Sequence, residues 1–446
     1  MNNKVNSTVK DMTTGNIWKQ LIVFMIPLLV GNIFQQFYNT IDSVVVGNYV
    51  GKDALAAVTS TSPISIMLVG FFMGMSTGAG VVVSQYFGAK DTKSLRRSVH
   101  TAIMLTIILG ILFMIIGYLI TPVMLRFMDT PNSVMNDADK YLKTYFLGIL
   151  GLMLYNMASG ILRAVGDSKT PLYVLIFSSV MNIILDLLFV IVFKLGVFGV
   201  ALATIIAQFL SSFVVLFILF RSKDVYSLRI RELCIDFDIL KKIVKIGFPA
   251  GIQTAIVSFS NVFVQSYINH FGADAAAAWG VYTRIDAFAI LPLQSMGLSI
   301  TTYVGQNAGA NKKKRINDGI KIALVIAVVI TTIICAPLVI FAPTIASLFN
   351  KEALVIAYAT TFIRVNEFFD IVACTNQIHA GALRGVGNAI VPSIVMIFSF
   401  VVFRQIYLKI VSMLTSSIIP IAWGYPAGWI CCSIILFIYF KRHKIA

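Results

Sequence analysis

Charged residues are scarce in this chain of 446 residues: only 12% are Asp, Glu, Lys or Arg, whereas 58% are hydrophobic. A soluble domain carries about a quarter charged residues, and a soluble chain of this length would form two or three domains with polar surfaces. The 35 basic and 19 acidic residues are too few to cover them. The composition therefore excludes a soluble enzyme, a disordered chain and a fibrous one, and it predicts a protein whose main solvent is lipid.

The chain also lacks the residue patterns of metal centres, disulfide frameworks and catalytic groups. Its 5 cysteines are scattered apart from the adjacent Cys431 and Cys432, and its 4 histidines are far apart. No HExxH pattern and no Ser/His or paired-Asp spacing stands out. The first apolar run already has spanning length, so we expect no cleavable signal peptide. We therefore expect a membrane protein that is not an enzyme and needs no cofactor.

The formal net charge of +16 would suggest nucleic acid in a soluble protein, but its distribution argues against that partner. Most of the Lys and Arg residues lie in short clusters between long apolar runs. Basic residues stay on the cytoplasmic side of membrane proteins, where they interact with anionic lipid headgroups. Their bias places both termini in the cytoplasm of a multi-pass protein of the plasma membrane, and we expect no nucleic-acid binding.

Twelve apolar runs reach the length of about 20 residues that a membrane-spanning helix needs. A lone strand cannot satisfy its backbone in lipid, and the runs are continuous rather than alternating, so we expect an all-α protein and no β-barrel. The predicted helices cover residues 17–41, 55–80, 98–120, 141–163, 171–193, 197–220, 243–268, 279–302, 319–341, 356–382, 391–413 and 417–440.

The second half of the chain repeats the first at a constant offset of 221 residues. GILRAVGDSKTP (160–171) matches GALRGVGNAIVP (381–392), and QYFGA (85–89) matches QNAGA (306–310). Near the first helices the offset is 222, which pairs Pro27 with Pro249 and Asn39 with Asn261. Matching loops at one offset are unlikely to arise by chance, so we infer a duplication.

The duplication predicts two pseudo-symmetric bundles of six helices: an N-terminal lobe (1–220), a basic cytoplasmic linker (221–242) and a C-terminal lobe (243–446). Six is even, so both copies enter from the same side and form a parallel repeat. Secondary transporters place a substrate site between two such repeats. A channel is the alternative that the repeat alone leaves open.

Polar residues inside the spans are candidates for function. The first helix carries Asn32, Gln35, Asn39 and Asp42 within roughly an 80° arc, and Pro27 allows the same helix to kink. The seventh helix carries a neutral counterpart, formed by Thr254, Ser258, Asn261 and Gln265. We expect these stripes to face a substrate cavity; hydrogen bonding between neighbouring helices is the alternative.

Two carboxylates at similar depth in the first bundle suit a monovalent cation. Asp186 lies in the apolar run ILDLLFVIVF, with Asn182 one turn earlier, and Thr204 in the sixth helix offers a hydroxyl oxygen. Na⁺ prefers oxygen ligands. Coupling to H⁺ instead requires a carboxyl group whose affinity for the proton is raised. For Asp42 the alternative is an ordinary helix end in water.

The second bundle does not keep this acidic pair and has charges of its own. Arg364 and Glu367 are three residues apart and can form an ion pair, while Glu367 and Asp370 are further candidates for the substrate cavity. The roles of the remaining charged residues in its spans stay open: Arg284, Asp286 and Arg404.

The residues resemble those of the multidrug and toxic compound extrusion (MATE) transporters over essentially the whole chain. IPLLVGNIFQQFYNTIDSVVVG resembles the family's first helix, with the kink proline at Pro27 and the acid at Asp42. NIILDLLF resembles its cation motif at Asn182 and Asp186, and ALATIIAQ places Thr204 at the matching hydroxyl. The details are most similar to the DinF-like prokaryotic branch, although some branches carry an acid in helix seven that this chain lacks.

The resemblance implies an antiporter that exports organic, often cationic compounds in exchange for Na⁺ or H⁺. It implies that the cation binds Asp42, Asn182, Asp186 and Thr204, and that helix one then bends near Pro27 as the two lobes rock. We expect a monomer. The alternative is a flippase for lipid-linked oligosaccharides, whose pyrophosphate would require arginines in the cavity.

Overall fold

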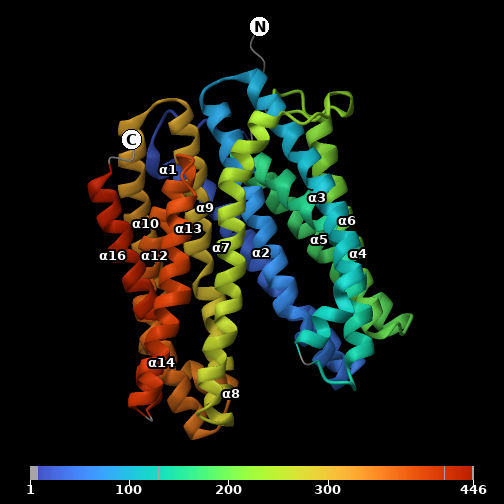
Figure 1. The fold of residues 1–446 in the computed structure, drawn as a ribbon, viewed down its shortest axis with the longest axis vertical. Coiled ribbons are helices and arrows are strands. Elements are labelled where there is room, and N and C mark those ends of the chain that lie inside the picture. The colour runs from blue at the N-terminus through green and yellow to red at the C-terminus, as the bar shows by residue number, and fades with distance from the viewer. Residues whose placement is uncertain (1–8, 129, 416, 444–446) are drawn as a thin grey trace. The chain divides into compact units, whose positions relative to one another are not determined.

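The computed structural model describes residues 9–128, 130–415 and 417–443, and all regular secondary structure in them is helical (Figure 1). In the first half, helices are α1 (Ile17–Val45), α2 (Lys52–Gly88), α3 (Thr92–Phe127), α4 (Met135–Ala164), α5 (Lys169–Leu187) and α6 (Gly196–Arg221). The second half contains α7 (Phe237–Asn269), α8 (Ala273–Ala289), α9 (Leu291–Gly309), α10 (Lys313–Ile340), α11 (Ala342–Phe349), α12 (Ala353–Gly385), α13 (Ile390–Ile397), α14 (Arg404–Leu414), α15 (Ile418–Ala422) and α16 (Gly424–Arg442). The π-helical segments are η1 (Val46–Val50), η2 (Leu188–Val192) and η4 (Phe398–Phe403), and η3 (Ile230–Glu232) is a 3₁₀ turn.

Eleven helical segments among the described residues are long and apolar enough to cross a membrane. They correspond to eleven of the twelve predicted spans, and the twelfth prediction, 356–382, falls in α12. With 33 residues α12 has spanning length, but Arg364, Glu367 and Asp370 lower its hydropathy. The predicted twelve-helix membrane architecture is therefore confirmed, and α12 is a crossing that carries two buried acids, Glu367 and Asp370.

Two compact units make up the chain, and it passes from one to the other between residues 11 and 12 and again inside helices α1 and α7. Of the described residues, the first unit contains 9–11 and 30–248, and the second contains 12–29 and 249–443. Residues 12–29 thus belong to the second unit, whereas the sequence prediction grouped them with the N-terminal lobe. The two crossing points inside helices lie at the prolines that the repeat had paired: Pro27 precedes the crossing in α1 by two residues, and Pro249 is the first residue after the crossing in α7.

Backbone geometry repeats at the offset of the sequence duplication. Positive φ angles occur in pairs that are 221 residues apart, at Lys90 (58°) and Asn311 (54°), Gly51 (116°) and Gly272 (94°), and Gly166 (89°) and Gly387 (93°). Each pair ends or begins corresponding helices in the two halves. The matched loops therefore adopt the same turns, as the sequence repeat predicts.

A side-chain cap also recurs at this offset. Oδ1 of Asp167 accepts a hydrogen bond from the backbone N–H of Thr170 at 3.0 Å, and Oδ1 of Asn388 accepts one from Val391 at 3.3 Å. Each oxygen thereby satisfies an N–H group of a first helical turn that has no partner within its helix. The change from Asp to Asn keeps the acceptor, which explains how both copies retain the turn.

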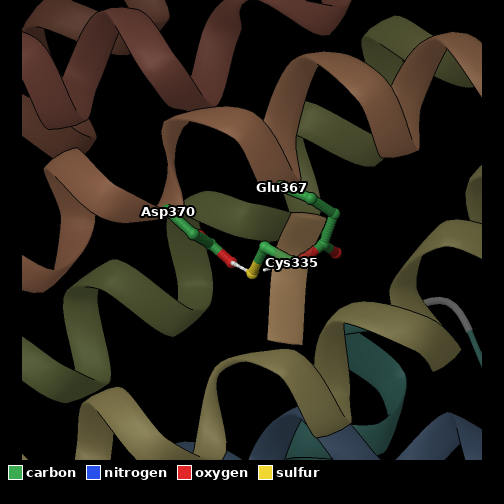
Figure 2. A group of neighbouring side chains, drawn as sticks. All are labelled: Cys335, Glu367 and Asp370. Atoms are coloured by element: carbon green, nitrogen blue, oxygen red, sulfur yellow. Dashed lines mark hydrogen bonds between the residues drawn. The ribbon is translucent and has the colours of Figure 1, made fainter. Parts of the chain in front are cut away.

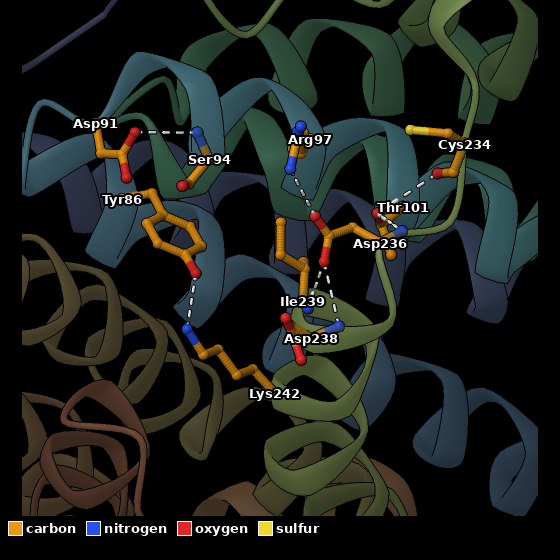
Figure 3. Close-up of polar contacts among 10 residues, drawn as sticks. All are labelled: Tyr86, Asp91, Ser94, Arg97, Thr101, Cys234, Asp236, Asp238, Ile239 and Lys242. Carbon is orange, nitrogen blue, oxygen red and sulfur yellow. Dashed lines mark hydrogen bonds and ion pairs between the residues drawn. The ribbon is translucent and has the colours of Figure 1, made fainter.

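The segment before α7 docks on α3 within the first unit (Figure 3). The backbone N–H of Asp236 donates to Oγ1 of Thr101 at 3.1 Å, and the Asp236 carboxylate pairs with Arg97 at 3.2 Å. One turn into α7, Nζ of Lys242 donates to the hydroxyl oxygen of Tyr86 at 2.9 Å. These contacts attach the start of α7 to the N-terminal half of the chain.

The segment before α1 docks in a comparable way within the second unit. The backbone N–H of Met12 donates to Oε1 of Gln306, and the Met12 carbonyl accepts from Nδ2 of Asn307. The guanidinium group of Arg315 donates to the carbonyls of Met12 and Gly15 at 3.1 and 2.9 Å. Apolar side chains of the first turns of α1 join the core of the same unit, so both polar and apolar contacts hold this segment there.

Glycine permits the closest helix crossings in both halves. A Cβ atom on Gly381 in α12 would lie 2.7 Å from the carbonyl oxygen of Gly297 in α9. At the corresponding position in the first half, a Cβ on Gly160 in α4 would collide with Ser76 in α2. These contacts repeat at the offset of 221 residues, so the duplication extends to the helix packing.

Candidate functional site

The first unit buries the acid that the sequence singled out in the fifth span. Asp186 lies one residue before the end of α5, and its exposed fraction is 0%. The helix continues as the π-helical segment η2 from Leu188. Such segments are frequent at functional sites because the extra residue per turn alters the direction of nearby side chains. A carboxylate in this place is costly unless it is neutralised by a proton or a cation.

Two further oxygen-bearing side chains are buried on α5 and α6. Asn182 lies one turn before Asp186 on α5 with an exposed fraction of 1%, and Thr204 lies on α6 with 6%. Oγ1 of Thr204 donates a hydrogen bond to the carbonyl oxygen of Val200 at 3.0 Å, and a hydroxyl oxygen that donates can also act as an acceptor or ligand. Ser178 links the helices directly, since its Oγ donates to the carbonyl of Ala207.

The fourth predicted ligand, Asp42, has a side chain outside the described residues, but the helix that carries it ends close to η2. Ile41 and Val45 of α1 belong to one apolar cluster with Val190 of η2 and Val197 of α6. The π-helical segments η1 and η2, which follow α1 and α5, are also in contact. The chain therefore brings the backbone of the α1 end to the segment that follows Asp186.

The polar stripe of α1 follows the change of unit at residue 30 and therefore belongs to the first unit. Asn32 is half-buried, whereas Gln35 and Asn39 are exposed. Gly31 precedes the stripe and lies close to Leu172 and Leu175 of α5. The same helix thus contacts α5 and presents amide groups outside the apolar core.

The corresponding stripe of α7 belongs to the second unit. Thr254 and Ser258 are half-buried, and Asn261 is exposed. Oγ1 of Thr254 donates to the carbonyl oxygen of Ala250, while Oδ1 of Asn261 accepts from Arg404 at 2.8 Å. Part of the hydrogen-bonding capacity of this stripe is therefore used within its own unit.

Arg404 is a buried cation in the second unit with several partners. Its guanidinium donates to Oγ of Ser260 at 3.0 Å and to Asn261, and it lies 4.7 Å from the ring centroid of Tyr425. The flippase alternative requires arginines that bind pyrophosphate, and Arg404 could serve in this way only by giving up these contacts.

Two acids of α12 are buried against a cysteine of α10 in the second unit (Figure 2). Sγ of Cys335 lies 3.4 Å from Oε2 of Glu367 and 3.8 Å from Oδ2 of Asp370. The predicted ion pair between Arg364 and Glu367 is wrong: Arg364 is exposed, and its Nε donates to the carbonyl of Val339. Positions 364 and 367 are only about 60° apart around α12, but the Arg364 side chain turns outward to the Val339 carbonyl while Glu367 is buried.

Sequence reasoning missed Cys335 as a partner of these acids. It precedes them by 32 and 35 residues on another helix, and no local spacing links residues on separate helices. The available signal was a cysteine in one apolar span and acids in another. Many cysteines that only pack in the core also occur in this way, so the signal is not specific.

Comparisons with known proteins agree with this architecture. The MatE family model matches residues 27–188 and 249–408, one stretch in each copy of the repeat. The Probable multidrug resistance protein YoeA of Bacillus subtilis is 30% identical over 436 residues, which cover 96% of this chain and 94% of that protein. The Multidrug export protein MepA of Staphylococcus aureus is 23% identical over 83% of this chain and 82% of its own. A MOP superfamily transporter from Pyrococcus furiosus has the same fold, with a TM-score of 0.92 and 23% identity over 99% of each chain.

Proposed function

This chain belongs to the MatE family of multidrug and toxic compound extrusion transporters, and on that premise we propose that it exports organic, often cationic compounds in exchange for Na⁺ or H⁺. Relatives named for multidrug resistance and multidrug export support the substrate class. The observation that carries the coupling is Asp186, a fully buried carboxyl group next to a π-helical segment, with Asn182 and Thr204 buried on the same two helices.

In the proposed cycle the cation enters from outside and binds Asp42, Asn182, Asp186 and Thr204. Cation binding bends α1 near Pro27, and the two lobes rock so that substrate leaves outward. The physical requirement is that the cation binds one conformation more tightly than the other. The change of unit two residues after Pro27 supports a hinge there, since a bend at this point moves the α1 end without moving residues 12–29.

The substrate cavity in this proposal is lined by the amide and hydroxyl stripes of the first and seventh spans: Asn32, Gln35, Asn39, Thr254, Ser258 and Asn261. The protein acts as a monomer in the plasma membrane with both termini in the cytoplasm. The excess of basic residues in the terminal tails and in the loops of the same side supports this orientation.

The test is efflux of a cationic dye from proteoliposomes under an imposed Na⁺ gradient or an imposed H⁺ gradient, each alone. One of the two gradients is expected to drive efflux by the wild type, and Asp186→Asn and Asp42→Asn are expected to abolish this drive. Asp238→Asn is the matched control, because Asp238 is an exposed acid in the first turn of α7, apart from the proposed ligands on α1, α5 and α6.

Wild-type-like coupled efflux by both variants, in correctly inserted protein, would overturn the site. Efflux without either gradient, or movement of lipid-linked oligosaccharide in place of dye, would overturn the antiport assignment.

A further inference from the structure

The buried cluster of Cys335, Glu367 and Asp370 lies in the second unit, apart from the residues of the proposed coupling site. One ligand atom from each side chain lies within 4.8 Å of the others. Figure 2 shows the Asp370 carboxylate and the Glu367 carboxylate approaching the Cys335 sulfur from two turns of α12. Three potential ligands therefore converge on one small region between α10 and α12.

This region gathers acidic groups with no basic side chain paired to them in the part of the chain that the structure describes. The exposed fractions of Glu367 and Asp370 are both 0%, and Oε1 of Glu367 and Oδ1 of Asp370 have no hydrogen-bond partner there. The ion pairs among the described residues all lie in the first unit. Asp286 of α8 interacts electrostatically with both acids and adds a further carboxyl group.

Burying carboxylates in this way is strongly unfavourable unless protons or a cation neutralise them. The sulfur atom indicates which cation fits. Na⁺ and Mg²⁺ prefer oxygen ligands alone, whereas a thiolate selects softer metals such as Zn²⁺. Two carboxylates and one thiolate also supply three negatively charged ligands, which a divalent ion compensates better than a monovalent one.

The two sulfur–oxygen distances match those of a tetrahedral metal centre. With a Zn–S bond of about 2.3 Å and Zn–O bonds of about 2.0 Å, sulfur and oxygen lie about 3.5 Å apart across the metal. The observed Sγ···O separations of 3.4 and 3.8 Å lie on either side of that value. We propose that Cys335, Glu367 and Asp370 form a binding site for a thiophilic divalent metal ion of the Zn²⁺ class.

The test uses the purified full-length protein under reducing conditions, with Co²⁺ as a spectroscopic probe and Zn²⁺ as its competitor. Co²⁺ is expected to bind with a thiolate-to-metal charge-transfer band, which Zn²⁺ removes. Cys335→Ser is expected to lose the band. Glu367→Gln is expected to weaken Zn²⁺ binding by at least about tenfold, because removal of a residue that only supports a ligand already causes a loss of this size. Cys432→Ser, another buried cysteine of the second unit, is the control and is expected to keep the band.

No saturable Co²⁺ or Zn²⁺ binding, or a band that survives in Cys335→Ser, would overturn the proposal; the first result would identify a cluster that holds only protons. Should Cys335→Ser fail to fold, Glu367→Gln decides the question by its Zn²⁺ affinity, and unchanged affinity would refute the site. Metal binding is measured without a gradient, so its outcome is separate from that of the antiport experiment.

Discussion

The backbone N–H of Met12 donates a hydrogen bond to Oε1 of Gln306 over 2.8 Å, joining residues 294 positions apart. Both residues are almost completely buried. Asn307 and Arg315 then donate to the Met12 carbonyl, so both polar groups of one peptide residue are satisfied by the second unit. This segment directly precedes α1, the helix that bends in the proposed cycle. Its attachment therefore fixes the N-terminal end of α1.

We predict that Gln306→Ala destabilises the protein by about 1–3 kcal/mol, because the buried Met12 N–H loses its acceptor. Thermal unfolding of the purified protein measures the effect as a lower midpoint. Lys314→Ala, an exposed residue of α10, is the control and should leave the midpoint unchanged. Equal midpoints for Gln306→Ala and wild type would show that this hydrogen bond contributes no stability.

The glycine at the crossing of α9 and α12 gives a second prediction. Gly381→Ala would place a methyl group 2.7 Å from the Gly297 carbonyl oxygen, so the helices must separate, at a cost of about 1–3 kcal/mol. Gly280→Ala adds the same methyl group in the middle of α8 with no atom within 4 Å, and helix propensity predicts no loss or a gain of up to about 1 kcal/mol. Unfolding midpoints of the two variants should therefore shift in different directions, and a common shift would contradict the packing argument.

Thr204 separates a ligand role from a packing role. If its hydroxyl oxygen binds the coupling ion, Thr204→Val keeps the shape of the side chain and raises the ion concentration for half-maximal efflux by about tenfold, equivalent to about 1.4 kcal/mol. Thr204→Ser keeps the oxygen and is expected to stay close to wild type. Proteoliposome efflux at varied ion concentration measures both, and a larger defect in Ser than in Val would assign Thr204 to packing.

The pH dependence of stability provides a prediction outside the membrane spans. The side-chain and backbone groups of Ser94 hydrogen-bond to Asp91, the N-cap of α3, and hold the pKa of its carboxyl group below the usual value of about 3.9. A lowered pKa stabilises the folded state above the unfolded pKa, and this contribution disappears as the pH falls through the folded pKa.

Asp91→Ala should therefore lower the unfolding midpoint at pH 7, with the difference from wild type shrinking below about pH 3.9. Asp91→Asn keeps a capping oxygen but no titrating charge, so its midpoint relative to Asp91→Ala should not change with pH over this range. A constant difference between wild type and Asp91→Ala down to acid pH would rule out the ionised cap.

Much of the fold could be predicted because its signals are local. Apolar length identified the spans, and the loops around Gly166 and Gly387 repeated because each must adopt the same left-handed turn. The burial of Asp186 followed from its apolar neighbours.

Other features depend on which helices are neighbours, which the sequence does not state. An ion pair between Arg364 and Glu367 was expected from their spacing. The Glu367 side chain is instead buried, while Arg364 is exposed and contacts the Val339 carbonyl. Cys335 meets Asp370 only through the packing of α10 on α12. The grouping of residues 12–29 with the second unit likewise rests on hydrogen bonds between segments almost 300 residues apart.

The grouping of residues 12–29 and 221–248 has a consequence for either half of the chain taken alone. Each half is completed by an entry segment, 12–29 in the second unit and 221–248 in the first, that precedes the other half's main helices. A single six-helix copy would therefore lack the segment that covers its docking surface, unless a second copy supplied it by domain swapping.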